Sequence, residues 1–239
     1  MSEWDALRRR TAARIGLARS GASLATGALL EFRLAHARAR DAVHAEWNEA
    51  ALADALGGAL LVASQAADRR AYLLRPDLGR ALREVDSAAL ADQRGEHDLA
   101  IIVADGLSAQ AAERHAPSLL ARLLPALRGW RLAPLTLARH ARVALGDRVA
   151  AALGARAALI LIGERPGLSA PDSLGAYLTW APSPATTDAE RNCVSNIRPE
   201  GLGYDPAART IAFLLGRMRE LRLSGVALKD DSGSTLLRS

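Results

Sequence analysis

The sequence contains a single cysteine, Cys193, in a chain of 239 residues. No intramolecular disulfide can therefore form, and we expect the protein to reside in a reducing compartment. Aromatic residues are also scarce, at 4% of the chain, although half of all residues are hydrophobic. Alanine, leucine and valine must therefore build the core, and the length is sufficient for one large domain or for a core domain with an appendage.

Lysine is almost absent, because Lys229 is the only lysine among the 31 basic residues. The net charge is +5, but the arginines are dispersed among Asp and Glu, which favours a compositional bias over a nucleic-acid-binding face. No apolar run is long enough to span a bilayer, and the N-terminus lacks the apolar core of a signal peptide. The sequence therefore predicts a soluble, cytoplasmic protein that binds neither nucleic acid nor membrane.

Several motifs of self-sufficient active sites are missing. The chain has no G-x-G-x-x-G, no G-x-x-x-x-G-K-[ST] and no G-x-S-x-G, so no dinucleotide fold, phosphate loop or nucleophile elbow is indicated. It also lacks H-E-x-x-H and paired cysteines, so we expect no metal site. Cys193 has no histidine nearby in the sequence, which favours a structural thiol and leaves a stand-alone enzyme using this thiol as the alternative.

Composition divides the chain into four parts. The first is rich in Arg, Gly and Ser, and the second alternates Ala-Leu stretches with Arg-Pro-Asp and Gly breaks that indicate short helices. We expect Thr26 to cap a longer helix, with Leu30 and Leu34 on one side of it. The predicted parts are an N-terminal arm (1–25), a mainly helical region (26–97), an α/β domain (98–228) and a flexible tail (229–239).

The third part predicts an α/β fold with a largely parallel, Rossmann-like sheet flanked by helices. The run "DLAIIVA" from residue 98 is typical of a buried parallel strand. Ser108 is then placed to cap a helix that runs to about Leu127 and is interrupted by Pro117. The further expected elements are strands at 131–138, 157–163 and 174–181, and helices at 146–154 and 205–225, closed by Gly154 and Gly225.

Two charged loops follow strands of this predicted sheet. Asp105 and Gly106 end the strand at 98–104, and Gly163-Glu164-Arg165 ends the strand at 157–163. Ligands of open α/β sheets bind outside the carboxyl ends of the strands. The sequence therefore places both loops on the side where such a sheet normally binds a ligand.

Three segments together are specific enough to indicate a family. They are "ARIGLARSGASLATGALLEFRLAHARARDAVH", "DLAIIVADGLSA" and "LIGERPGLSAPDSLGAYLTW" followed by "RNCVSNIRPEGL". Over about residues 12–228 the chain resembles the small (light) subunit of ethanolamine ammonia-lyase, with these segments in the family's order and spacing. One departure is Ala35, which stands where the family pattern leads us to expect Asp.

The resemblance implies a role next to adenosylcobalamin. In this family the holoenzyme converts ethanolamine to acetaldehyde and ammonia by radical chemistry, so this lyase subunit is expected to be inactive alone and to carry no catalytic residue. The large subunit, a TIM barrel, binds ethanolamine, while the small subunit completes the cofactor pocket. The family's cofactor contacts fall on Val143, Glu164 and Cys193.

Each of these contacts is chemically reasonable. Glu164 can accept a charge-assisted hydrogen bond from a corrin amide, while Val143 and Cys193 can offer apolar surface or backbone groups to the ring. Arg165 is expected either to pair with Asp172 or to reach the phosphate of the cofactor. No histidine occurs in a D-x-H-x-x-G pattern, which is consistent with a cofactor that keeps its own benzimidazole ligand or with no contact to cobalamin at all.

The sequence leaves one alternative for the function and one for the location. An alternative function is a non-catalytic scaffold subunit that binds the large chain without touching the cofactor. The arm at 1–25 could serve assembly or targeting, so residence within a bacterial microcompartment is the alternative to a free cytoplasmic location.

Overall fold

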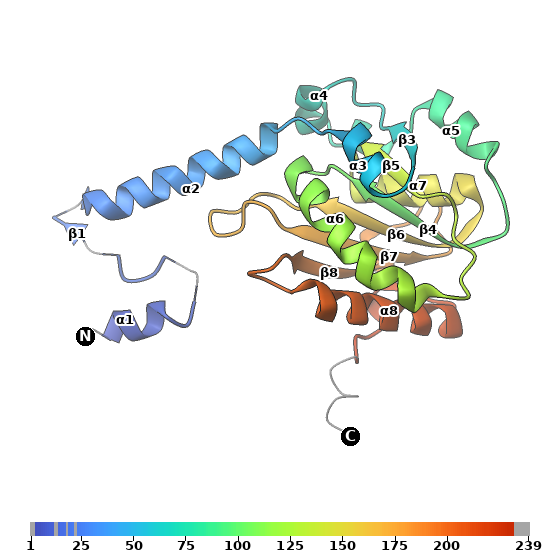
Figure 1. Ribbon diagram of the computed structural model, residues 1–239. Coiled ribbons are helices and arrows are strands. Elements are labelled where there is room, and N and C mark those ends of the chain that lie inside the picture. Colours follow the sequence, from blue (N-terminus) through green and yellow to red (C-terminus); the bar gives the residue numbers. More distant parts are fainter. Residues whose placement is uncertain (1–2, 12–13, 18, 22, 232–239) are drawn as a thin grey trace.

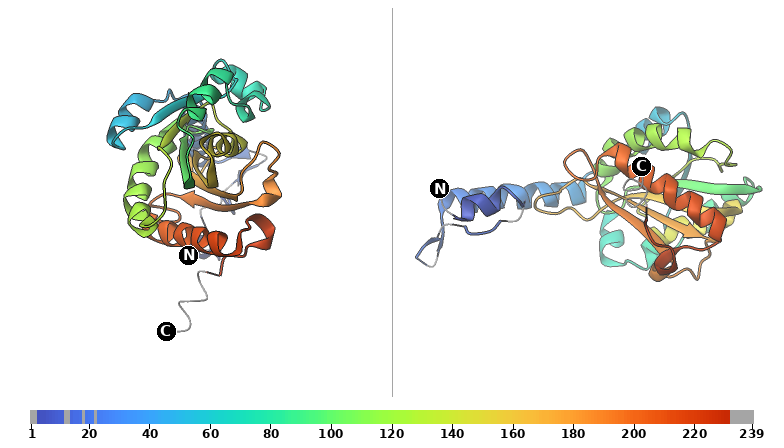
Figure 2. Two further views of the ribbon diagram at one scale, coloured as in Figure 1. Left: turned by 90° about the vertical axis from the view of Figure 1, so that its right-hand side faces the viewer. Right: turned by 90° about the horizontal axis from the view of Figure 1, so that it is seen from below.

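The computed structural model describes residues 3–11, 14–17, 19–21 and 23–231. A long helix, α2 (Thr26–His44), projects from a layered body, and the short helix α1 (Glu3–Arg8) lies on the same side of that body (Figures 1 and 2). A small antiparallel pair, β1 (Arg19–Ser20) and β2 (Ser23–Leu24), precedes α2. The predicted arm therefore contains more regular structure than its sequence pattern indicated. Of the predicted flexible tail (229–239), residues 232–239 lie outside the described residues.

The body is built on a six-stranded sheet with the order β3-β5-β4-β6-β7-β8. The first four of these strands are parallel, β7 is antiparallel to β6, and β8 is antiparallel to β7. This arrangement confirms the predicted α/β fold with a largely parallel sheet. The strands are β3 (Leu60–Ala63), β4 (His97–Ala104), β5 (Thr136–Arg139), β6 (Ala155–Gly163), β7 (Leu174–Trp180) and β8 (Arg191–Ile197).

Helices cover both faces of the sheet (Figure 2). On one face α6 (Ala109–Leu123) and α8 (Tyr204–Leu221) pack together, and on the other α7 (Val143–Leu153) packs against β4 and β6 with α5 (Glu84–Ala91) beside it. Successive residues of β4 join different cores, Ile101 on the α6 side and Ile102 on the α7 side. Burial on both faces explains why this strand is a continuous apolar run rather than an alternating one.

Two strands lie where the sequence pattern indicated none. β3 falls in the region predicted to form short helices, and it pairs with β5, so this region contributes an edge strand to the same sheet. β8 forms the opposite edge, and only three of its seven residues are buried. Edge strands that are short or mostly polar lack the apolar run that identifies a central strand. The other helices here are α3 (Glu49–Ala55) and α4 (Arg69–Leu74), with short 3-10 turns at Leu78–Arg80, Leu124–Leu127, Asp188–Glu190 and Gly225–Ala227.

Several helix boundaries differ from those expected. Thr26 is the first residue of α2 rather than its cap, and Ala25 in the cap position makes no side-chain bond. Pro117 does not interrupt α6, because the packed face of that helix compensates for the missing N–H group. The closing helix ends at Leu221 rather than near Gly225, since Arg222 itself adopts the left-handed conformation and donates its N–H to Met218.

Two predicted caps are confirmed. The Ser108 side chain accepts a hydrogen bond from the Ala111 N–H at the start of α6. Gly154 ends α7 with a positive φ of 76°, a conformation that glycine adopts without steric cost. These two residues fix where the chain leaves β4 and where it enters β6.

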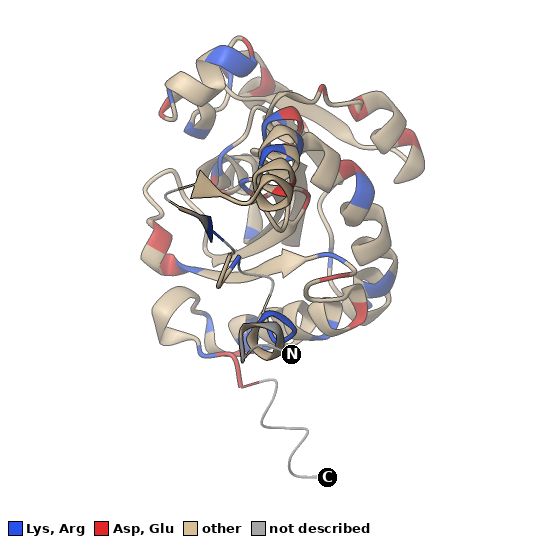
Figure 3. Ribbon diagram, turned by 90° about the vertical axis from the view of Figure 1, so that its left-hand side faces the viewer, with Lys and Arg blue, Asp and Glu red and all other residues tan. Residues whose placement is uncertain are grey.

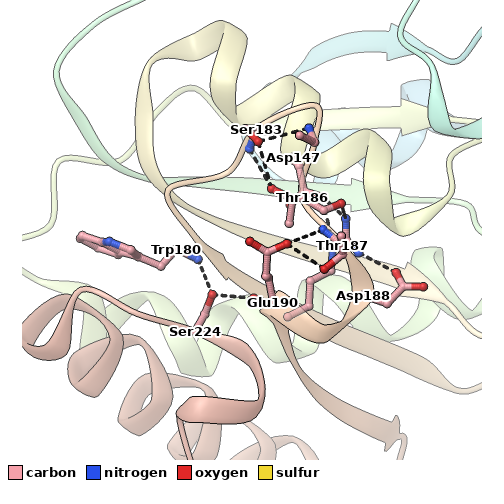
Figure 4. A network of polar contacts seen from close by, with 10 residues as sticks. Asp147, Trp180, Ser183, Thr186, Thr187, Asp188, Glu190 and Ser224 are labelled. Atoms are coloured by element: carbon pink, nitrogen blue, oxygen red, sulfur yellow. Dashed lines mark hydrogen bonds and ion pairs between the residues drawn. The ribbon is translucent and has the colours of Figure 1, made fainter.

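A buried ion pair ties α7 to the edge strand β8. Arg191 donates through Nε to Asp147 at 3.1 Å and through Nη2 to the same carboxylate, and both side chains are only 3% exposed. Arg191 also bonds the Asp188 carboxylate and the Thr186 carbonyl, and Figure 4 shows Asp147 of α7 close to the loop that carries Thr186 and Asp188. Burial raises the pKa of Asp147, and the hydrogen bonds from Arg191 oppose that rise.

Replacing Arg191 should therefore cost stability. Arg191→Met leaves the Asp147 charge buried without its main partner, which lowers the free energy of unfolding by about 3–5 kcal/mol. Denaturant titration of the full chain measures this loss. The matched control is Arg217→Met, which removes an exposed pair with Glu220 and should cost less than about 1 kcal/mol. Equal losses in the two variants would contradict the assignment of Arg191 as a buried anchor.

Candidate functional site

The loops after β4 and β6 meet at the carboxyl edge of the sheet. The Leu107 N–H donates to the Gly163 carbonyl at 2.9 Å. A Cβ atom on Gly106 would lie 2.2 Å from the Gly163 oxygen, and one on Gly163 would lie 2.0 Å from the Ser108 oxygen. Gly106 also has a positive φ of 54°. Only glycine permits this approach, so both glycines are required to place Glu164 next to the end of β4.

Val143 lies near the same edge of the sheet, just after the end of β5. The chain leaves β4 through α6 on one face of the sheet and leaves β5 through α7 on the other face. Neighbouring strands whose connections diverge in this way form the crevice where doubly wound sheets bind ligands. Val143 is the first residue of α7 and therefore stands at the rim of that crevice.

Two cavities adjoin along this rim. The Glu164 cavity, of about 410 Å³, is lined by Glu164 and Val143, and the Cys193 cavity, of about 360 Å³, is lined by Cys193 and Val143. Arg142 and Tyr177 also line both. The structure thus brings the three predicted site residues onto one continuous surface. Each cavity has the size of a typical small-molecule site, while contact with a cofactor stays a prediction.

The Glu164 carboxylate is held by one of its two oxygens. Oε2 accepts a hydrogen bond from the Ser173 hydroxyl at 2.6 Å and another from the Asn196 N–H at 3.1 Å. The Glu164 N–H in turn donates to the Ser173 carbonyl at 2.9 Å. Among the described residues, Oε1 receives no hydrogen bond. The carboxylate is therefore fixed in orientation and keeps one oxygen available for a donor in the cavity.

A buried histidine anchors the loop that carries Ser173. His115 on α6 is 1% exposed, and its Nε2 lies 2.8 Å from the Asp172 carbonyl. Because a carbonyl only accepts, Nε2 carries the proton, and in the neutral ring Nδ1 accepts from the Tyr204 hydroxyl at 2.8 Å. Burial is the main reason that the pKa of His115 is lowered. The neutral ring thus holds the backbone next to the residue that orients Glu164.

Cys193 lies opposite Tyr177 in the β7–β8 pair, with its side chain exposed at the cavity wall. Loss of hydration raises the pKa of the Cys193 thiol, and the nearby Glu164 carboxylate raises it further. Burial likewise raises the pKa of the Tyr177 hydroxyl. A thiol that resists ionisation is a poor nucleophile, so the site favours Cys193 as a neutral wall residue.

The predicted ion pair between Arg165 and Asp172 is wrong. Asp172 pairs instead with Arg114 on α6 at 2.8 Å, because the anchored loop turns its carboxylate toward that helix. Arg165 is exposed and forms no ion pair within the described part of the chain. Its alternative role, reaching a phosphate group, stays a prediction.

Sequence reasoning missed four residues of this site. Arg142 and Tyr177 line both cavities, Tyr72 lines the Glu164 cavity and Arg80 lines the Cys193 cavity. A signal existed for Arg142, which directly precedes Val143. Arg80 and Tyr72 lie in the region read as short helices, and only the fold brings them to this edge.

Other functional classes receive no support from the described residues. No group of three or more His, Cys, Asp or Glu residues among them could hold a metal ion. Basic and acidic segments are interspersed over the described body rather than gathered on one face (Figure 3). Within the same residues, no helix combines the length and apolar character needed to cross a bilayer.

Known proteins resemble this chain over nearly its whole length. The family model of the ethanolamine ammonia-lyase light chain (EutC) matches residues 1–229. The chain is 54% identical to the ethanolamine ammonia-lyase small subunit of Azotobacter vinelandii (strain DJ), over 96% of this chain and 88% of that protein. It is 49% identical to the small subunit of Pseudomonas aeruginosa (strain LESB58) and 51% identical to that of Pseudomonas putida (strain KT2440), with the same coverage.

The state of His115 leads to a pH prediction. Because its pKa is lowered on folding, the unfolded chain binds more protons, so this residue contributes stability that is full above about pH 6.5 and is lost as pH falls toward the folded pKa. His115→Gln should therefore show a shallower loss of unfolding free energy between pH 7.5 and 5.5 than the parent chain, by at most about 1.4 kcal/mol per pH unit. The exposed His36→Gln is the control. Identical pH profiles for His115→Gln and the parent would contradict this reading.

Proposed function

The chain belongs to the ethanolamine ammonia-lyase light-chain family, and from this premise we propose that it completes the adenosylcobalamin site of an ethanolamine ammonia-lyase. The enzyme would convert ethanolamine to acetaldehyde and ammonia. The observation that carries the proposal is the joint placement of Val143, Glu164 and Cys193 along one surface lined by two adjoining cavities. These three residues come from three separate segments of the chain.

The chemistry of this surface fits the cofactor. The corrin rim bears neutral amides, which donate hydrogen bonds, and Glu164 presents an acceptor oxygen that no described residue uses. Val143 and the protonated Cys193 offer apolar area beside it. None of the histidines lines either cavity, so these walls would offer no imidazole ligand to the cobalt. The two cavities adjoin through Val143, so together they suit a ligand much larger than either.

The roles of cofactor and protein divide accordingly. When bound, the cofactor supplies the radical chemistry that breaks the substrate C–H bond. This chain's own residues would bind and orient it: Glu164 would accept a hydrogen bond from its amide rim, and Val143 and Cys193 would offer apolar surface that excludes water. We assign no catalytic residue to this chain, and ethanolamine binds on the large subunit, proposed to be a TIM barrel.

The projecting helix α2 supports a partner chain. Leu30 and Leu34 lie one turn apart on α2 and are 58% and 52% exposed. Apolar side chains that project from the body in this way are typical of a surface that another chain covers. The alternative function, a scaffold subunit without cofactor contact, shares this feature and differs only at the Glu164 and Cys193 cavities. Residence in a bacterial microcompartment is a further proposal for which the arm is the candidate segment.

Glu164 distinguishes the two functions. Glu164→Gln keeps the shape and can still accept from Ser173 and Asn196 through its carbonyl, but it loses charge assistance toward the cofactor. A hydrogen bond to a charged group contributes on the order of 1.5–3 kcal/mol, so cobalamin affinity of the two-subunit complex should fall roughly ten- to a hundredfold. Absorbance titration measures the affinity, and Glu84→Gln, an exposed carboxylate outside both cavities, is the control. Unchanged affinity together with a large drop in Tm would instead make Glu164 a structural turn residue.

The division of roles predicts a dependence on the partner. The purified chain should not deaminate ethanolamine with adenosylcobalamin present, because the described residues contain no complete catalytic set. Adding the large subunit should restore turnover, measured as acetaldehyde released. Deamination by the single chain, or full activity of the large subunit without it, would overturn the proposal.

A further inference from the structure

The Cys193 cavity carries positive charge that the amide rim of a corrin does not require. Three arginines line it, Arg80, Arg142 and Arg191. Arg191 is already paired with Asp147 and with Asp188. The other two form no ion pair with any Asp or Glu among the described residues. Asp188, one of these partners of Arg191, is the only acidic residue among the described residues of the lining. The cavity therefore contains two guanidinium groups without an ion-pair partner in the described chain, and its lining keeps a net positive charge.

Arg142 is held in place without an acidic partner. Its guanidinium carbon lies 4.2 Å from the centre of the Tyr72 ring, and its Nη2 donates to the Tyr72 carbonyl at 3.1 Å. Its Nε is buried and has no hydrogen-bond partner within the described chain. A buried donor left unpaired is costly, and a ligand acceptor is one way to satisfy it. Stacking on Tyr72 limits the rotamers of Arg142, so less entropy is lost when it binds an anion.

Arg80 is fixed to the same wall by the backbone. It ends the short 3-10 turn Leu78–Arg80, and the Arg142 N–H donates to the Gly79 carbonyl at 2.8 Å. A Cβ on Gly79 would lie 2.9 Å from the Cγ of Arg142, so the two segments are in direct contact. Arg80 itself is exposed and lines the cavity together with Arg142. The two arginines thus belong to one cavity lining and come from adjoining segments.

The start of α7 adds to the same potential. This helix of 11 residues begins at Val143, has no side-chain cap and carries no acidic residue in its first turn. The N-terminus of a helix bears a partial positive charge. Val143 and Ala144 both line the Cys193 cavity, so this end of α7 opens onto it beside Arg142.

We propose that Arg80 and Arg142 form a phosphate subsite in the Cys193 cavity. Guanidinium groups match the oxygens of a phosphate and remain charged at all relevant pH values, which makes a phosphate monoester or diester the favoured ligand group. The phosphate has two sources: the phosphodiester of the cofactor, in which case the inference rests on the proposed function, or free phosphate. Arg165 lines only the other cavity and is not part of this subsite.

The first experiment measures the binding of inorganic phosphate to the full chain by titration calorimetry. The parent chain should show saturable binding, and Arg142→Gln and Arg80→Gln should each weaken it at least tenfold. Arg148→Gln is the matched control, because it removes the same charge from α7 outside the cavity. If Arg142→Gln fails to fold, Arg80→Gln still tests the subsite, because Arg80 is exposed and its replacement should not affect folding. Binding that no variant alters, or absence of binding together with a negative second experiment, would overturn the subsite.

The second experiment identifies the source of the phosphate. The two-subunit complex is titrated with cobalamin and with cobinamide, a corrin without the nucleotide phosphate. If the cofactor supplies the phosphate, Arg80→Gln should weaken cobalamin about tenfold and leave cobinamide unchanged. Unchanged affinity for both corrins, with phosphate binding lost, supports a subsite for free phosphate. If the affinity for both corrins falls equally and the chain binds no phosphate, the subsite is overturned. Failure of the proposed function is detected separately, by unchanged cobalamin affinity in Glu164→Gln.

Discussion

The contact between Gly106 and Gly163 determines where the functional edge of this protein lies. Both backbones pass so close that a single Cβ atom would collide with a carbonyl oxygen. The approach is possible because β4 and β6 are adjacent parallel strands in register from Ala100 to Ala104. It forces Glu164 to emerge beside the end of β4 and the start of α7, rather than out into solvent. The rest of the site is arranged around that carboxylate.

Packing on opposite faces of the sheet then fixes the other walls. On one face, His115 of α6 holds the backbone that carries Ser173, which orients Glu164. On the other face, the buried pair of Arg191 and Asp147 joins β8 to α7, so the strand that carries Cys193 keeps its position relative to Val143. Both anchors combine burial with an obligatory hydrogen-bond partner, which makes their geometry difficult to change. A site assembled in this way is largely formed before any ligand arrives.

The two cavities share one wall, because Arg142, Val143 and Tyr177 line both. Beyond that wall their charged groups differ: one cavity adds Glu164 and Arg165, and the other adds Arg80, Arg191 and Asp188. Glu164 presents an oxygen that accepts from donors such as neutral amides. Arg80 and Arg142 attract an oxyanion. Acceptor and cationic groups at separate places along one surface favour one orientation of a large ligand over its reverse.

The sequence alone determined the α/β class, the central strands β4 and β6, the caps at Ser108 and Gly154 and the position of Glu164 just after β6, because these depend on local patterns and on short-range sterics. The edge strands β3 and β8 escaped prediction because short or polar strands take their stability from neighbours distant in sequence. Pro117 was misjudged for the same reason, since packing of α6 outweighs its local cost. The partner of Asp172, and the gathering of Tyr72, Arg80, Arg142 and Tyr177 around the cavities, were decided by the tertiary structure alone, because no spacing along the chain encodes which side chains meet across a sheet edge.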